Sequence, residues 1–151
     1  MEDHSCHNTL MHYGLHKLRN VTQDANYLFK CVQGWTSQGF RPHAISAQNE
    51  PLNSNPTYPT SKLTASQEGQ IGTRLRSLLN SNGFSDVEIV GYDHNWSAAS
   101  SYPIQLMQDA GDAFYGVSFH CYAVSTESLD SKSIDFLVLG KRRLTKFGLG
   151  R

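Results

Sequence analysis

The feature of this chain that most restricts its fold is a regular alternation of helical and strand patterns between residues 26 and 125. Stretches with apolar residues at helical spacing alternate with short apolar runs, and polar segments separate them. Strand, helix, strand, helix and strand joined by short connections predict right-handed βαβ units and therefore a parallel sheet. The expected helices cover residues 27–39, 64–81 and 102–110, and the expected strands cover residues 43–48, 86–92 and 115–122.

Local start and stop signals support the three helices. Gly39 follows the first helical stripe, where glycine commonly ends a helix. Thr64, followed within the next turn by Glu68, is a capping signal for the start of the second helix. Asn82-Gly83 ends the same helix. Pro103 is suited to the first turn of the third helix. Tyr27, Phe29, Cys31, Val32, Trp35 and Phe40 are expected on one side of the first helix.

Chain length limits how much of a parallel β/α fold can be present. The sequence has 151 residues, whereas a complete eight-stranded β/α barrel needs about 250 residues. The chain could therefore supply only part of such a barrel. We expect three regions of unequal character: an atypical leader over residues 1–22, an α/β part over residues 23–123, and a divergent basic tail over residues 124–151.

The two ends lack the periodicity of the middle. Residues 1–22 hold four of the seven histidines together with Cys6. Their spacing matches no usual zinc pattern, so a loosely ordered leader is favoured over a metal site. Residues 141–146 form a basic run, which is more often a solvated face than a nucleic-acid site when no aromatics accompany it. The prediction therefore includes no metal, no cofactor and no nucleic acid.

Composition excludes further classes. Lys and Arg number 13 and Asp and Glu number 13, so the chain has no net field to steer nucleic acid or an anionic membrane. No apolar run approaches the roughly 18 residues of a membrane span. The start, MEDHSCHNTL, lacks the basic and apolar regions of a signal peptide. The three cysteines lie far apart and predict buried or free thiols rather than disulfides.

The strongest candidate for chemistry is Glu50, in the segment ISAQNEP of residues 45–51. A carboxylate directly after an apolar strand is held rigidly, and partial burial raises its pKa, which suits it to proton transfer. In parallel β/α folds the chemistry lies at the carboxyl ends of the strands. The polar residues after the three expected strands should therefore converge. The alternative is a surface-loop carboxylate.

Several motifs in one order resemble glycoside hydrolase family 30, the family of glucosylceramidases and fungal endo-β-1,6-glucanases. The resemblance covers residues 27–122, close to two thirds of the chain. It rests on the segments KCVQGW (30–35), AISAQNEP (44–51), GYDHNW (91–96) and GVSFHCY (116–122). The motifs CVQGW and DHNW are similar to the β-1,6-glucanases rather than to the lysosomal branch.

The resemblance implies part of a TIM (β/α)8 barrel, with parallel strands, crossover helices and atypical ends, and a retaining mechanism on β-glucan or a glucoside. Glu50 matches the acid/base residue and Asn49 the residue that hydrogen-bonds the sugar 2-hydroxyl. The implied substrate-cleft residues are Asp93, His94, Asn95, Trp96, His120 and Tyr122, with Trp96 as a platform for a sugar ring. For His120 a core imidazole is nearly as well supported as a substrate contact, and a structural role is a still closer alternative for Trp96 and Tyr122. The family implies an extracellular location, although this chain shows no signal peptide.

The chain departs from the family at the nucleophile, which should follow a seventh strand some tens of residues after His120. Glu127 lies only seven positions beyond His120 and is not assigned this role. A retaining enzyme without its nucleophile has little activity, so the chain is expected to be inactive alone. The alternative is a non-catalytic carbohydrate-binding remnant or an interaction module.

Overall fold

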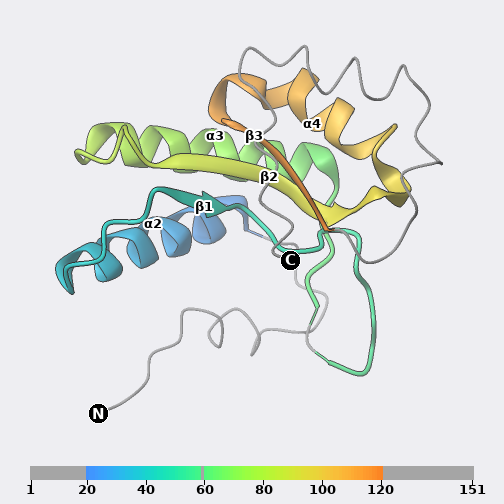
Figure 1. Cartoon of the computed structure of the whole chain (residues 1–151), viewed down its shortest axis with the longest axis horizontal. Coiled ribbons are helices and arrows are strands. Elements are labelled where there is room, and N and C mark those ends of the chain that lie inside the picture. The colour runs from blue at the N-terminus through green and yellow to red at the C-terminus, as the bar shows by residue number, and fades with distance from the viewer. Residues whose placement is uncertain (1–19, 59, 121–151) are drawn as a thin grey trace, which may run out of the picture.

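The computed structural model describes residues 20–58 and 60–120, and Figure 1 draws the remaining residues in grey. The main elements in chain order are α2 (Val21–Ser37), β1 (Ala44–Ser46), α3 (Ala65–Ser81), β2 (Glu88–Asn95), α4 (Tyr102–Ala110) and β3 (Gly116–His120). Two 3-10 turns, η1 (Trp96–Ala98) and η2 (Gly111–Ala113), flank α4. Most of the leader, the basic tail, Tyr122 and Glu127 lie outside the described residues.

The three strands form one parallel sheet in the order β1-β2-β3, as the alternation predicts. Ile45 pairs with Ile89, and Val90 pairs with Gly116. Helix α3 connects β1 to β2, and α4 connects β2 to β3, so both connections are crossovers. In Figure 1 the three strands run from left to right, and β2 and β3 end close together just right of the centre. The fold class is α/β, as expected.

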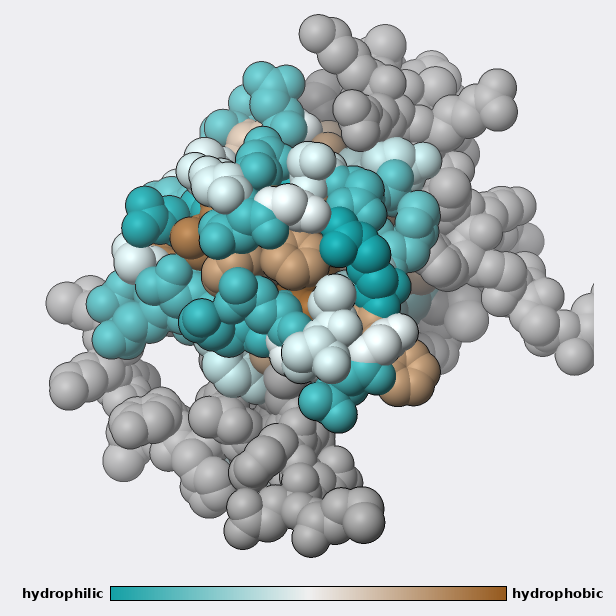
Figure 2. All heavy atoms as spheres, turned by 90° about the vertical axis from the view of Figure 1, so that its left-hand side faces the viewer, coloured by the Kyte–Doolittle hydropathy of each residue, from teal (hydrophilic) through white to brown (hydrophobic). Residues whose placement is uncertain are grey.

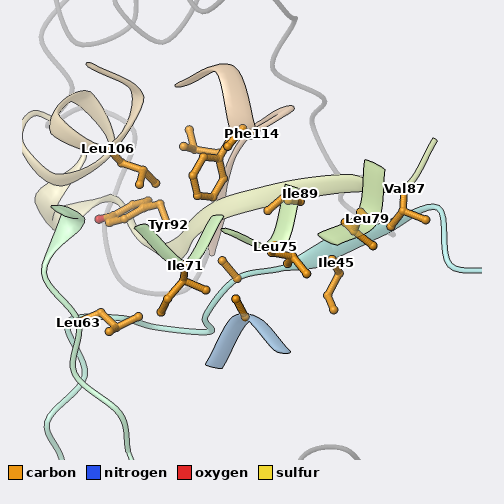
Figure 3. Packing of buried hydrophobic residues seen from close by; sticks show 14 of the residues in the cluster. Ile45, Leu63, Ile71, Leu75, Leu79, Val87, Ile89, Tyr92, Leu106 and Phe114 are labelled. Carbon is orange, nitrogen blue, oxygen red and sulfur yellow. The ribbon is translucent and has the colours of Figure 1, made fainter. Parts of the chain in front are cut away.

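The core lies between the sheet and the helices (Figure 3). Helix α3 contributes an unbroken stripe of buried side chains at spacings of three and four residues, which is the apolar stripe of an amphipathic helix. Close packing depends on two glycines: a Cβ at Gly72 would lie 2.2 Å from the ring of Phe114, and one at Gly91 would lie 3.0 Å from the same ring. The fully buried apolar residues include Val32, Leu63, Ile71, Leu75, Leu79, Val87, Ile89, Tyr92 and Leu106.

The capping residue of α3 and the glycines after α2 and α3 lie where the sequence predicts, but the capping-box partner of Thr64 differs. Thr64 caps α3 through a capping box, but its partner is Gln67 at the third helical position rather than Glu68. Glu68 is instead fully buried. Gly39 and Gly83 both follow helix ends and have positive φ angles of 88° and 80°. This left-handed conformation suits glycine because it has no Cβ to clash.

Two expectations about element limits are wrong. Helix α2 begins at Val21, before the expected start at residue 27, and the Asn20 side chain caps it. Strand β2 continues to Asn95, into the polar group of residues 93–96 that was expected to close it after residue 92. The ladder between β2 and β3 shifts between Gly91 and His94, and this irregularity lets the strand resume.

The first helix buries a smaller set of residues than its pattern suggests. Trp35 is 40% exposed and Phe40 is 75% exposed. The buried face consists of Ala25, Phe29 and Val32, with Cys31 beside them. Phe40 lies beyond the helix end, where helical periodicity no longer sets its direction.

The end of the molecule where the strands begin is mostly hydrophilic, with a strip of apolar surface among polar groups (Figure 2). Among the described residues, no helix is long and apolar enough to cross a membrane. The opposite end, where the strands finish, carries a cluster of ionisable side chains from β2, β3 and the segment after β1.

Candidate functional site

The backbone around Glu50 is fixed by the neighbouring strand. The chain after β1 stays paired to β2, because the Ala47 amide donates to Val90 O at 3.0 Å and the Glu50 amide donates to Asp93 O at 3.0 Å. Glu50 itself has φ of 49°, an uncommon angle for a residue with a side chain. The buried Pro51 follows and restricts the turn. The carboxyl group is therefore held at the carboxyl end of β1.

Both oxygens of the Glu50 carboxyl group have partners. Asn53 Nδ2 donates to Oε2 at 2.7 Å, and His120 Nδ1 lies 3.2 Å from Oε1. The Glu50 side chain is 18% exposed. The carboxyl group is thus partly withdrawn from water but still exposed at the surface. A carboxyl group in such a setting can exchange a proton with a bound molecule.

His120 joins two carboxylates. Its Nδ1 faces Glu50, and its Nε2 lies 3.4 Å from Asp93 Oδ1. The same Asp93 oxygen accepts a hydrogen bond from Ser118 Oγ at 2.7 Å. Ser118 and His120 alternate with Val117 and Phe119 on β3, so they share one face of the sheet. Glu50, Asp93, Ser118 and His120, on the three strand ends, are therefore joined by hydrogen bonds and ion-pair contacts into one group, which we call the carboxyl-end cluster.

The irregular part of β2 places Asp93 in this cluster. Tyr92 and Asp93 have φ angles of 66° and 42°. The Tyr92 amide donates to Oε1 of Glu68 on α3 at 2.9 Å. Burial raises the pKa of Glu68 to about 7, and the Tyr92 amide and the Tyr102 hydroxyl group oppose this rise. A buried acid on a helix thus satisfies the backbone donor that the strand irregularity releases.

The other predicted site residues lie around the carboxyl-end cluster rather than within it. Asn49 is exposed. The His94 side chain is buried, its ring centroid lies 5.7 Å from that of Tyr92, and burial lowers its pKa. Asn95 Oδ1 is buried and has no hydrogen-bond partner among the described residues.

Trp96 is less open than a free sugar platform would be. Its ring stacks on Phe119, with centroids 4.0 Å apart and planes inclined by 9°, so one face is covered. Half-buried, it packs against the edge of the core. Tyr122, the last predicted cleft residue, lies outside the described residues.

Three residues of this region were not singled out from the sequence. Asn53 follows Glu50 by three positions in a polar loop, and only its contact identifies it. Ser118 precedes His120 by two, so strand alternation alone places both on one face. Glu68 extends the stripe of Ile71, Leu75 and Leu79 by one turn. An acidic residue on an apolar stripe is a signal of a buried carboxyl group that the sequence did carry.

The chemistry available to the described residues is acid/base chemistry. Among residues 20–58 and 60–120, no group of three or more His, Cys, Asp or Glu side chains could hold a metal ion. The carboxyl-end cluster instead offers a partly buried carboxyl group, an imidazole and a second carboxylate in contact. Such a group can hold and transfer a proton.

Comparisons with known proteins find similar sequences among fungal enzymes. The endo-1,6-beta-D-glucanase of Neurospora crassa is 37% identical over 112 residues, which are 71% of this chain and 22% of that protein. The endo-1,6-beta-D-glucanase BGN16.3 of Trichoderma harzianum is 36% identical over 104 residues, or 68% of this chain and 21% of that protein. The chain spans about a fifth of the length of these relatives. No protein-family profile matches the chain.

Solved structures share the fold. SrfJ from Salmonella typhimurium superposes with a TM-score of 0.69 at 21% identity, covering 81% of this chain and 27% of that one. The endo-beta1,6-glucanase BT3312 gives 0.62 at 23% identity, covering 71% and 25%. The catalytic domain of GH30 xylanase C from Talaromyces cellulolyticus gives 0.59 at 24% identity, covering 68% and 24%. The described residues therefore have the fold of part of a TIM barrel, as predicted.

Proposed function

Because the chain belongs to glycoside hydrolase family 30, we propose that it carries the acid/base part of an enzyme that hydrolyses β-1,6-linked glucan. The observation that supports this most is the placement of Glu50. It lies at a strand end with a partly buried carboxyl group, in contact with His120 and Asn53. Active sites of β/α barrels occupy this end of the strands.

Glu50 would act twice in a retaining reaction. In the first step its carboxyl group donates a proton to the glycosidic oxygen as the bond to the anomeric carbon breaks, while a separate carboxylate attacks that carbon. In the second step the Glu50 carboxylate takes a proton from water, which displaces the enzyme carboxylate from the sugar. In both steps Glu50 changes its protonation state while it stays in contact with Asn53 and His120.

Neighbouring groups supply orientation in this proposal. Asn53 holds Oε2 of Glu50, so the carboxyl plane is fixed. His120 links the carboxyl group to Asp93, which is itself held by Ser118. Asn49 precedes Glu50 and is exposed, which leaves its amide open to a sugar hydroxyl group. Asp93, His94, Asn95, Trp96 and Tyr122 remain proposed substrate-cleft residues.

The chain by itself is proposed to bind glucan weakly and not to hydrolyse it, because the proton donor acts together with a nucleophile that we assign to no residue here. Turnover of β-1,6-glucan by the isolated chain would contradict this part of the proposal. Binding without turnover in a chimera that contains the complete barrel would instead favour a carbohydrate-binding module. An extracellular site of action is part of the proposal, by family resemblance.

The decisive experiment grafts this segment into a complete enzyme. Residues 21–120 replace the matching segment of the Trichoderma harzianum relative, and kcat/KM is measured on β-1,6-glucan. Removing a general acid typically lowers the rate by about 10²- to 10⁴-fold, so Glu50→Gln should have this effect. On an aryl β-glucoside with a nitrophenolate leaving group the first step should suffer less, since that group departs without a proton.

Asp109→Asn provides the matched control. Asp109 is an exposed carboxylate on α4 that accepts a hydrogen bond from Gln105, far from the strand ends. This variant should keep the activity of the graft. An active graft in which Glu50→Gln is as active as Asp109→Asn on β-1,6-glucan would refute the acid/base role.

A further inference from the structure

Glu68 is a fully buried acid that the proposed reaction does not use directly. It lies on α3, on the helix side of the sheet, whereas Glu50 and His120 lie at the strand ends. Its Oε1 accepts the Tyr92 amide at 2.9 Å. The groups that act on it from the packed elements are Tyr92 and Asp93 of β2 and Tyr102 of α4.

The Tyr92 amide is the link between Glu68 and the carboxyl-end cluster. The β2–β3 ladder pairs Gly91 with Val117 and then His94 with Phe119, so Tyr92 and Asp93 fall in the gap. Both residues have positive φ, a conformation that persists only where surrounding contacts determine it. The Glu68 carboxylate supplies such a contact by binding the amide in the gap.

The unpaired backbone of Tyr92 and Asp93 in turn positions Glu50. The Asp93 carbonyl accepts the Glu50 amide at 3.0 Å, and the Asp93 carboxylate faces His120, which faces the Glu50 carboxyl group. A change in the Tyr92–Asp93 backbone therefore reaches Glu50 by two routes, one through the main chain and one through the imidazole. The coupling between residues 68 and 50 therefore passes through β2.

We propose that Glu68 is a positioning residue: by binding the Tyr92 amide from the helix side, it fixes the backbone turn that places Asp93 against Glu50 and His120. This inference rests on the proposed acid/base role of Glu50 for its catalytic meaning. Burial raises the pKa of Glu68 to about 7. Its hydrogen bond to the Tyr92 amide is strongest when the carboxyl group is ionised, so the positioning should vary with pH around neutrality.

The test uses the full chain and backbone amide NMR, without saccharide. Glu68→Gln keeps a carbonyl acceptor but cannot ionise, and Glu68→Met removes the acceptor at similar size. Leu75→Ala, a fully buried change on the same helix, controls for general loss of stability. In Glu68→Met, exchange of the Tyr92 amide should be about tenfold faster than in Leu75→Ala, the size of a lost charged hydrogen bond. Glu68→Gln should restore most of the protection.

A pH titration separates positioning from packing. In the wild-type chain the amide signals of Tyr92, Asp93 and Glu50 should share an inflection near pH 7, and in Glu68→Gln this shared inflection should vanish. The ring signals of His94 and His120 are followed in the same samples, so that their own titrations are distinguished from that of Glu68. If Glu68→Met does not fold, the Glu68→Gln titration alone decides.

Two results would overturn the inference. One is an inflection at Tyr92 that is absent at Glu50, which would mean that the turn does not transmit the change. The other is an unchanged shared inflection in Glu68→Gln, which would assign it to a histidine. Failure of the proposed function would appear elsewhere, as an active graft that is indifferent to Glu50→Gln, and would leave this coupling intact.

Discussion

Both ends of this sheet contain residues with positive φ, but these residues are glycines at one end and residues with side chains at the other. At the end where the strands begin, positive φ occurs at Gly39 and Gly83. At the end where they finish, it occurs at Glu50, Tyr92 and Asp93. Left-handed residues with side chains are strained by about 1–3 kcal/mol each. The difference indicates that the carboxyl end retains strain to keep particular side chains, whereas the starting end relieves it with glycine.

Ionic groups differ between the ends in the same way. At the starting end Arg41 pairs with Asp86 and also donates to the Gly83 carbonyl at 2.8 Å, while Arg76 donates to the Val87 and Phe84 carbonyls at 2.7 and 3.1 Å. These cations satisfy main-chain acceptors and so hold the fold. At the carboxyl end the charged groups face one another and leave Glu50 within reach of solvent. The starting end thus serves stability, and the carboxyl end is suited to function.

The largest test of this contrast is Arg76→Met. Removing the guanidinium group leaves two partly buried carbonyls without their donors, and each loss costs about 1–3 kcal/mol, so the free energy of unfolding should fall by about 4 kcal/mol. Urea denaturation measures it. Arg74→Met, an exposed change on the same helix, is the control and should stay within about 0.5 kcal/mol. Similar losses in the two variants would contradict a stabilising role for Arg76.

The next largest change in the free energy of unfolding is expected from Glu68, and it depends on pH. Folding raises its pKa from 4.5 to about 7, so the folded state binds the proton more tightly than the unfolded state. Its contribution to stability is therefore complete below about pH 4.5 and is lost as pH rises through about 7, an amount of about 3 kcal/mol. Urea denaturation between pH 4 and 8 should show this fall in the wild-type chain and not in Glu68→Gln. Parallel pH profiles in the two proteins would rule it out.

A smaller effect tests the glycine at the starting end. Gly83→Ala adds a Cβ that meets no atom within 4 Å, so the change isolates backbone strain at φ of 80°. The expected loss is about 1–2 kcal/mol in thermal or urea denaturation. Gly34→Ala is the matched control, since Gly34 also has open space but lies within α2, where alanine should stabilise by about 0.5–1 kcal/mol.

Glu50→Gly is the reverse substitution at the carboxyl end. It relieves the strain at φ of 49° but loses the contacts with Asn53 and His120, so the free energy of unfolding should change by less than about 1 kcal/mol. If Glu50→Gly destabilised the chain more than Gly83→Ala does, Glu50 would be a structural residue, and the contrast between the ends would fail.

The smallest effect is expected from the exposed ion pair at the starting end. The hydrogen bond from Arg41 holds the pKa of Asp86 at about 2, below its ordinary value of 3.8. Its stabilisation is therefore present above about pH 4 and is lost as pH falls through about 2. Asp86→Asn should lower the urea midpoint slightly at pH 6 and not at pH 2, and salt should weaken the difference. Asp112→Asn, an exposed change in η2, is the matched control.

Much of the fold was predictable because its signals are local. The stripe of α3, the stop at Gly83 and the short apolar runs of the strands depend on neighbours within a few residues. Trp35 was misplaced because a helix's apolar face depends on which partners it meets, and Phe40 because the helix ends before it. Strand β2 was predicted too short because the ladder shift between Gly91 and His94 leaves no local signal. The position of Glu50 at a strand end was predictable for the local reason, while its partners were not.

The sequence by itself determined the parallel α/β architecture, the limits of α3 at its caps and the presence of a carboxylate after the first strand, since periodicity and capping are properties of adjacent residues. Only the tertiary structure decided which polar groups meet. Glu50 and His120 are 70 positions apart, and Glu68 and the Tyr92 amide are 24 apart. Contacts at such separations depend on strand order, register and one shift of the ladder, and no local pattern encodes that shift.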